Sequence, residues 1–526
     1  MVAAFATFTG VNMESQTDME KPQTSPGHAY LISARKLSKN VLLNLFAEGI
    51  PLLVSLFCIP VLVHRLGTEQ FGILTLAWAI IGYFGIFDMG LGRALSKLVA
   101  EKLGRKENES IPALFWTGLV MMGVLGLVGA AILVGGASFA VVHILTISQK
   151  FQHETLLILY LLAATIPFVI GSSALVGVLS AYQRFDIIVK IRMPLGSWMF
   201  LGPLLAVLVF HTLISAVWMM VLGRCLMFVM AGLMCRRAVS GLHKPILKRD
   251  ALKSLFSFGG WVTVSNIISP IMAYMDRFFI AAAIGLTAVA YYTTPYTVAV
   301  KFQIIPSVLL TVLFPALSTM FAYDRVRARR AFEVSGALVL SAMLPIVIIV
   351  VGFAGFGLSF WLGKDFANHS ETVLQILMVG ILLNSLAFVP YASIQADGRP
   401  DITAILHLIE LPVYLVVLWF ALHAWGIVGA AAAWTVRAGL DWILLLSICS
   451  VNVKSAMAIR LIALTAALLC SLFAMSQINN LIVRGILCLV IMTVYIVLSW
   501  RFLLDVSGRN DMKRIMHATI SRLRFV

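Results

Sequence analysis

Charged and amide side chains interrupt the long apolar runs of this sequence at only a few positions. The candidates for a functional role among them are Asn44, Glu48, Asp88, Arg93, Asn266, Asp276, Arg277 and Lys301. An ionised side chain in hydrocarbon costs about 2.5–3.5 kcal/mol on insertion scales, so these groups are expected to face a hydrated or paired interior. Basic and amide side chains can hold an anionic ligand there, and the three acids can pair with the bases or carry protons.

A structural role is the alternative for the same residues. Asp88 with Arg93, or Asp276 with a neighbouring arginine, would then form an ion pair that fixes helix packing. Two further arginines, Arg224 and Arg437, lie at equivalent places in two later apolar runs. For them we favour packing, because a repeated position suggests a repeated structural job.

Motifs for metals, cofactors or covalent catalysis are missing from the sequence. The six cysteines show no CxxC spacing, and the ten histidines form no HExxH or HxxxH pair. No Walker loop occurs, and no GxGxxG follows a strand-like run. The sequence therefore predicts no catalytic residue, no metal ligand and no cofactor.

The composition selects the class of protein. Of the 526 residues, 61% are hydrophobic and 12% are charged, against roughly 45–50% and about 25% in soluble domains. So few charges could not cover the surface of a soluble enzyme, and disorder requires low hydrophobicity. Continuous apolar runs, rather than alternation over about ten residues, disfavour a β-barrel. An all-α polytopic membrane protein is expected.

Hydropathy predicts about fourteen transmembrane helices with short connections. They are expected near 40–63, 71–98, 112–140, 155–181, 191–210, 214–235, 259–284, 288–321, 333–361, 371–396, 402–422, 427–449, 457–476 and 482–503. The longest outside loop has about ten to fifteen residues on this reading. A membrane polymerase or ligase, which would usually carry a long periplasmic loop with catalytic groups, is therefore disfavoured.

Lysine and arginine are distributed unevenly between the alternate loops. With a cytoplasmic N-terminus, 30 of the 39 lie in inside segments and 4 in outside segments. This asymmetry is the positive-inside signal, and it places both termini in the cytoplasm. We read the net charge of +16 as this signal, with attraction to anionic lipids of the inner leaflet, and not as nucleic-acid binding.

The sequence contains an internal repeat. AYQRFDI (181–187) returns as ADGRPDI (396–402), and Gly67 after the first helix matches Gly285 after the seventh. Six helices per repeat is an even number, so two six-helix lobes should be related by an axis along the membrane normal. We expect a disordered cytoplasmic tail at 1–36, an N-lobe at 37–238, a cytoplasmic linker at 239–258, and a C-lobe at 259–450. Two extra helices and a basic cytoplasmic tail should follow at 451–526.

Residues 44–107 resemble the first two helices of the Wzx-type polysaccharide flippases, which belong to the multidrug/oligosaccharidyl-lipid/polysaccharide exporter superfamily. The shared features are a first helix ending in Leu-Gly, Phe71-Gly72, Asp88-x-Gly90-Leu91-x-Arg93 and a basic turn. Asp276-Arg277, followed by Gly285, resembles the equivalent unit of the second half.

The resemblance implies two bundles whose helices 1, 2, 7 and 8 line a central cavity, with alternating access by rocking of the lobes. It implies transport of a polyprenyl-diphosphate-linked glycan from the inner to the outer leaflet of the bacterial inner membrane. Arg277, Lys301, Arg93, Asn44 and Asn266 would bind substrate, and Glu48, Asp88 and Asp276 would couple transport or form ion pairs. H+ or Na+ and the polysaccharide polymerase machinery are further expected partners.

Two transport functions within the same superfamily remain alternatives. An ion-coupled multidrug antiporter would prefer an acidic cavity, whereas here Arg277 and Lys301 add bases to the acids. A lipid II flippase would suit fourteen helices, but the first helix carries Glu48 rather than a basic residue. The mixture of charges favours an anionic substrate.

Overall fold

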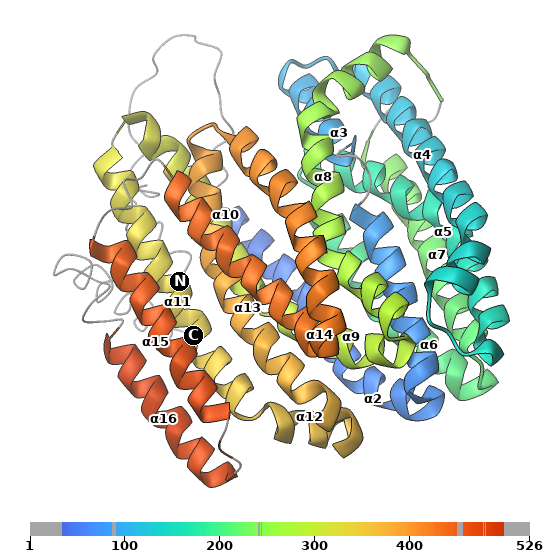
Figure 1. Cartoon of the computed structure of the whole chain (residues 1–526). Coiled ribbons are helices and arrows are strands. Elements are labelled where there is room, and N and C mark those ends of the chain that lie inside the picture. The colour runs from blue at the N-terminus through green and yellow to red at the C-terminus, as the bar shows by residue number, and fades with distance from the viewer. Residues whose placement is uncertain are drawn as a thin grey trace. The chain divides into compact units, whose positions relative to one another are not determined.

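The computed structural model describes residues 34–86, 91–239, 242, 245–323, 325–449, 456–476, 478 and 480–498 (Figure 1). Within these ranges the regular secondary structure is helical and contains no β-strand. Contacts divide the chain into two compact units. The N-terminal unit comprises Leu43–Pro295 and Ala404–Ala433, and the C-terminal unit comprises Met1–Leu42, Tyr296–Thr403 and Trp434–Val526. The six-helix lobes and the 239–258 linker stay a prediction.

Eight α-helices, taken within the described ranges, begin at or before residue 286. They are α2 (Ala34–Ile86), α3 (Leu91–Gly104), α4 (Ile111–Phe139), α5 (Gln149–Ala181), α6 (Phe185–Phe210), α7 (Leu213–Ala238), α8 (Arg249–Ala283) and α9 (Leu286–Lys301), with the short helix η1 (Asn108–Ser110) before α4 and the π-helical turn η2 (Ala140–Ile144) after it. The later helices are α10 (Ile304–Tyr323), α11 (Arg325–Gly352), α12 (Ala354–Leu362), α13 (Lys364–Ala396), α14 (Pro400–Ile448), α15 (Ala456–Ser476) and α16 (Leu481–Leu498).

Eight helical segments in the described ranges are long and apolar enough to cross a membrane. A polytopic membrane protein is therefore the class of this chain, and the number fourteen stays a prediction. Two of the long helices contain a kink at a glycine with positive φ. Gly67 (φ 76°) divides α2 and Gly426 (φ 60°) divides α14, each between two of the predicted spans. Glycine suits these positions because a Cβ disfavours positive φ.

The predicted span 288–321 is broken into α9 and α10 at residues 302–303. Pro306 follows the break. A proline lacks the N–H that would bond the carbonyl four residues earlier, and its ring crowds that carbonyl. The Phe302 carbonyl accepts instead from the N–H of Ile305 (3.2 Å), so the chain passes the break through a tight turn.

The repeated heptapeptides form the same turn in both halves. Gln183 and Gly398 each adopt a positive φ (55° and 80°), and the next residue, an arginine in both copies, donates its N–H to the carbonyl five residues earlier. The N···O distances are 2.9 Å for Arg184 and 3.2 Å for Arg399. This six-to-one bond is the mark of the Schellman helix ending. The sequence repeat at these positions is therefore also a structural repeat.

The turn after α5 is closed by an ion pair on its surface. Arg184 contacts Asp186 through two nitrogens, Nε to Oδ1 at 3.0 Å and Nη2 to Oδ2 at 3.1 Å. These hydrogen bonds favour the charged carboxylate and hold the pKa of Asp186 below its usual range. Both groups are well exposed, so the pair helps to fix the shape of the turn and adds little stability.

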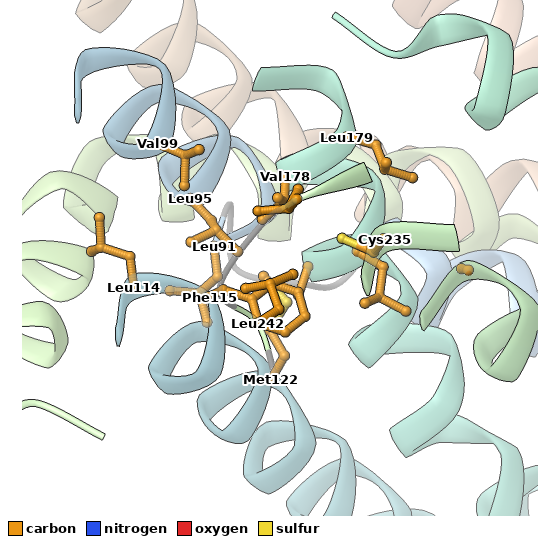
Figure 2. Packing of buried hydrophobic residues seen from close by; sticks show 14 of the residues in the cluster. Leu91, Leu95, Val99, Leu114, Phe115, Met122, Val178, Leu179, Cys235 and Leu242 are labelled. Atoms are coloured by element: carbon orange, nitrogen blue, oxygen red, sulfur yellow. The ribbon is translucent and has the colours of Figure 1, made fainter. Parts of the chain in front are cut away.

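A buried apolar cluster in the N-terminal unit joins α3, α4, α5 and α7. Figure 2 labels Leu91, Leu95, Val99, Leu114, Phe115, Met122, Val178, Leu179, Cys235 and Leu242 from it. Lipid tails are as apolar as leucine, so close van der Waals contact, rather than removal of water, stabilises such packing within the membrane.

The first residues of the predicted linker are fastened to the start of α4. The Trp116 indole N–H donates to the Leu242 carbonyl (3.2 Å), and the Lys248 N–H donates to the Thr117 hydroxyl (3.3 Å). The Leu242 side chain is fully buried in the apolar cluster. The guanidinium of Arg236 lies 5.8 Å from the Trp116 ring centroid, close enough for cation–π attraction.

Close approach of α4 and α5 depends on Gly126. A Cβ added there would lie 2.5 Å from the Pro167 Cα, and backbone atoms cannot swing away as a side-chain end can. We expect Gly126→Ala to lower the free energy of unfolding by about 1–3 kcal/mol, as overpacking commonly does. The melting temperature of the purified protein in detergent measures this.

Gly135→Ala is the control in the same helix, because nothing lies within 4 Å of its added Cβ. It should leave the melting temperature unchanged or raise it slightly, since alanine has the higher helix propensity. Equal melting temperatures for the two variants would contradict the packing described for Gly126.

Candidate functional site

Asp276 and Arg277, adjacent on α8, form the centre of a buried polar cluster in the N-terminal unit. The Asp276 side chain is fully buried and that of Arg277 is 5% exposed. Arg277 Nη1 lies 3.6 Å from Asp276 Oδ1, and the Arg277 backbone N–H donates to the same oxygen (2.8 Å). The Tyr292 hydroxyl donates to Asp276 Oδ2 at 2.7 Å. Each carboxylate oxygen therefore accepts from a donor, as a buried charge requires.

The guanidinium of Arg277 is held on its other sides by α8 itself. Nη1 donates to the Ala273 carbonyl at 2.7 Å, and the guanidinium carbon lies 4.9 Å from the Tyr274 ring centroid. The ring face adds cation–π attraction. Of the two roles left open for Asp276 and Arg277, the structure contains the ion pair, and ligand contact by Arg277 stays a prediction.

The hairpin between α8 and α9 brings Tyr292 to Asp276. Gly285 turns the chain with φ 124°. Asp276 precedes this turn by nine residues and Tyr292 follows it by seven. Antiparallel helices place such positions at similar depth, because both rise about 1.5 Å per residue. Tyr292 was missed from the sequence, and counting outward from Gly285 would have been the signal for it.

The end of this hairpin is held by the loop between α4 and α5. The Thr146 N–H donates to the Ala281 carbonyl (2.9 Å), and the Thr146 hydroxyl donates to the Ala282 carbonyl (2.7 Å). In the same loop the Ser148 hydroxyl donates to the carboxylate of Glu69 in α2. By the predicted topology these three turns belong to the outside face, so they fasten together on one side of the membrane.

The cluster contains one acid, Asp276, which is shielded from its surroundings by burial and by its hydrogen-bond donors. Its negative charge is offset by Arg277, and each of its oxygens accepts a hydrogen bond. The arrangement can thus fix helix packing, and the acid can also carry a proton. Either role needs the pairing just described.

The remaining predicted site residues have different environments. Lys301 ends α9 and is half-buried, and Arg93 on α3 is exposed. Asn44, Glu48 and Asn266 lie on the backbones of α2 and α8, but their side chains are outside the described residues. Asp88 is also outside the described residues. Asp276 and Arg277 are predicted residues that the structure brings into mutual contact.

A polar contact next to Lys301 lies within the C-terminal unit. Gln303, at the break between α9 and α10, donates its amide N–H to the side-chain oxygen of Asn384 in α13 (2.8 Å). The amide pair satisfies polar groups at a point where the helix is interrupted, as hydrocarbon surroundings require. Neither amide was singled out from the sequence, because a polar residue in a helix does not reveal its partner on another helix.

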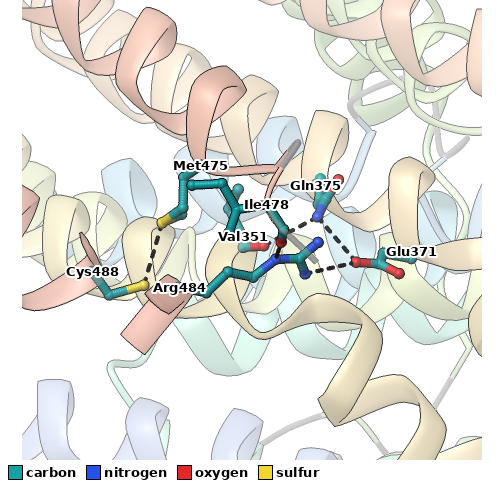
Figure 3. Close-up of polar contacts among 7 residues, drawn as sticks. All are labelled: Val351, Glu371, Gln375, Met475, Ile478, Arg484 and Cys488. Atoms are coloured by element: carbon teal, nitrogen blue, oxygen red, sulfur yellow. Dashed lines mark hydrogen bonds and ion pairs between the residues drawn. The ribbon is translucent and has the colours of Figure 1, made fainter. Parts of the chain in front are cut away.

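A second polar cluster fastens α16 to α13 in the C-terminal unit (Figure 3). Arg484 Nη1 lies 3.2 Å from Glu371 Oε1, and Arg484 Nε donates to the Ile478 carbonyl. Gln375 donates to the Val351 carbonyl (3.2 Å) and to Glu371 Oε1 (3.4 Å). The sequence placed Arg484 in an outside segment. Its charge is paired with Glu371, which gives this arginine a positioning role for the last two helices.

Comparison with known proteins places the chain among membrane transporters. A family model described as "Polysaccharide biosynthesis protein" matches residues 37–321. A protein of Shigella flexneri named "Putative O-antigen transporter" is 34% identical over 412 residues, which are 77% of this chain and 96% of that relative.

Solved structures with the same fold belong to proteins with more than one transport function. The lipid II flippase MurJ in an inward closed conformation has a TM-score of 0.68 at 13% identity, and the match covers 89% of this chain and 100% of that chain. A multidrug resistance MATE family transporter of the MOP superfamily, in an inward-facing conformation, has a TM-score of 0.66 at 14% identity, covering 84% and 96%. These likenesses confirm the all-α polytopic fold and, at such identities, the fold alone.

The bond from Tyr292 to Asp276 gives a test of the cluster. We expect Tyr292→Phe to lower the free energy of unfolding by about 1–3 kcal/mol, because it leaves a buried carboxylate oxygen without its donor. Thermal unfolding of the purified protein measures the change. Tyr160→Phe removes the hydroxyl of an exposed tyrosine on α5 (38% exposed) and should leave the melting temperature unaltered. A Tyr292→Phe protein as stable as this control would refute the bond.

Proposed function

Because the chain belongs to the polysaccharide biosynthesis protein family, we propose that it is a flippase that moves a polyprenyl-diphosphate-linked oligosaccharide from the inner to the outer leaflet. The family match confirms the resemblance found in residues 44–107. The observation that carries the proposal is the 34% identity over 96% of a relative named for O-antigen transport. The destination of the glycan is then cell-surface polysaccharide.

The mixture of buried charges supports an anionic substrate over a cationic drug. Asp276 is offset by Arg277 at 3.6 Å, so this part of the N-terminal unit does not present a free acid to a cation. Lys301 adds a base at the end of α9. The fold itself does not separate the two functions, since both flippase and drug transporter share it.

We assign roles to the sequence-selected residues on this basis. Diphosphate and sugar would be bound by the bases and amides, which are Arg277, Lys301, Arg93, Asn44 and Asn266. Coupling to H+ or Na+, or pairing with the bases, would fall to Glu48, Asp88 and Asp276. The chain would work as a transporter without chemical catalysis, in the bacterial inner membrane, with both termini in the cytoplasm. Contact with the polymerase machinery would follow from its substrate.

Deletion of the gene tests the proposal directly. Lipid-linked oligosaccharide is then quantified separately in the two leaflets, using a membrane-impermeant glycan-modifying enzyme on sealed vesicles of each orientation. Accumulation on the cytoplasmic side is expected. Unchanged glycolipid together with altered drug sensitivity would replace the proposal by the antiporter, and accumulation of lipid II would replace it by the peptidoglycan precursor function.

A pair of matched variants tests the assigned site. Arg277→Ala and Arg484→Ala each break one ion pair, to Asp276 and to Glu371 respectively. We expect Arg277→Ala to reduce export, normalised to protein abundance, by about ten-fold more, since a charged hydrogen bond contributes about 1.5–3 kcal/mol. Surface polysaccharide measured after plasmid complementation of the deletion gives the readout. Equal reductions would remove Arg277 from the substrate site.

A further inference from the structure

Arg224 is a charged residue in the middle of a membrane-spanning helix. It lies eleven residues after the start of α7 (Leu213–Ala238), which is one of the segments long and apolar enough to cross a membrane. At 1.5 Å per residue, the guanidinium starts about 16 Å from that end of the helix. Arg224 therefore starts far from both ends of the helix.

The side chain of Arg224 points toward the interior of the N-terminal unit. Met220, Ala231 and Cys235, which lie one, two and three turns away on the same face of α7, are fully buried. Leu222, Leu226 and Val229, on the opposite face, are 46–54% exposed. Arg224 itself is half-buried, on the face of α7 that packs into the unit.

Within the described residues, Arg224 has no acidic partner. Its Nε atom is buried and has no hydrogen-bond acceptor. The phenol of Tyr274 on α8 is near enough to act electrostatically on it. A phenol is uncharged at neutral pH and offers only a dipole, so it does not neutralise the guanidinium, which itself cannot lose its proton.

Tyr274 connects this arginine to the Asp276–Arg277 cluster. The Arg277 guanidinium carbon lies 4.9 Å from the ring centroid of Tyr274. The Tyr274 hydroxyl lies close to Gly82 of α2, because a Cβ added to Gly82 would be 2.6 Å from the hydroxyl oxygen. Arg277 thus lies over the Tyr274 ring, and the Tyr274 phenol is near enough to act electrostatically on Arg224. Asp276 offsets the charge of Arg277, and the charge of Arg224 is left in excess.

We propose that Arg224 binds the diphosphate of the transported lipid as it passes the middle of the membrane, a role that rests on the flippase function proposed above. An uncompensated charge at this depth is costly, and an anion arriving there removes that cost. A diphosphate offers oxygens in the geometry that a guanidinium engages with two parallel bonds. The depth also selects the ligand, because headgroups of bulk phospholipids remain at the interface.

The proposal adds Arg224 to Arg277 as an arginine that binds the substrate. From the sequence, Arg277 was assigned to ligand and Arg224 to packing. The structure gives Arg277 a carboxylate and a carbonyl, whereas the Nε of Arg224 has no acceptor in the described part of the chain. An anion that contacts Arg224 therefore has no ion pair to break first.

Thermal unfolding of the purified full-length protein tests the proposal, with undecaprenyl diphosphate as the probe. Wild type should be stabilised by the probe, and R224M should need at least about ten-fold more of it for the same shift, as expected for loss of a charged contact. R224K should fall between them. R65M, which alters an exposed arginine in α2, should behave as wild type.

The melting temperature without ligand separates binding from packing. Removing an unpaired buried charge should leave the R224M protein as stable as wild type or more stable, whereas loss of a packing or ion-pair role would lower its melting temperature. An R224M protein that is clearly less stable without ligand, yet responds to undecaprenyl diphosphate as wild type does, would overturn the proposal.

Three further probes identify the anion. Inorganic pyrophosphate should stabilise wild type weakly and R224M less, and undecaprenol, which has no charge, should not distinguish the two proteins. Equal dependence on Arg224 for phosphatidylglycerol would assign the site to bulk lipid headgroups and overturn the proposal. Equal shifts of wild type and R224M by undecaprenyl diphosphate would do the same while leaving the flippase function intact. A wild type that ignores undecaprenyl diphosphate would count against both.

Discussion

The absence of water around most of this chain is the constraint on which its polar structure depends. A charged or hydrogen-bonding group inside hydrocarbon cannot be solvated by water, so its partner must come from the protein or from a ligand. Asp276 illustrates the first solution, because Arg277 and Tyr292 engage both of its oxygens. Glu371 illustrates it again in the C-terminal unit, with Arg484 and Gln375 as donors. Arg224 illustrates the second solution, in which the proposed ligand supplies the partner.

Much of the fold could be predicted because hydropathy and turn chemistry are local. The class of protein, the turns around Arg184 and Arg399, and the bends at Gly67 and Gly285 are visible in short stretches of sequence, and the structure contains them. Interruptions inside a span were harder to see. The break between α9 and α10 depends on Pro306, and a proline in an apolar run predicts loosening without saying whether the helix stops.

The candidate site was predictable in its residue types and less so in its pairings. Asp276 and Arg277 were visible because they are charged, whereas Tyr274 and Tyr292 resemble the other aromatic residues of the spans. A helical period gives the face on which a residue lies, but not its depth against the next helix. The distinction between Arg277 and Arg224 therefore had to come from the structure, since both are arginines in apolar runs and only their neighbours differ.

The anchoring of residues 242 and 248 to α4 fastens the approach to α8 within the N-terminal unit. Trp116 and Thr117 hold the backbone at Leu242 and Lys248. Lys248 directly precedes α8, so the helix that carries Asp276 and Arg277 begins at a point bonded to α4. The buried charges are thereby tied to the same helix bundle at both ends of α8, because Thr146 holds the carbonyls of Ala281 and Ala282 at its other end.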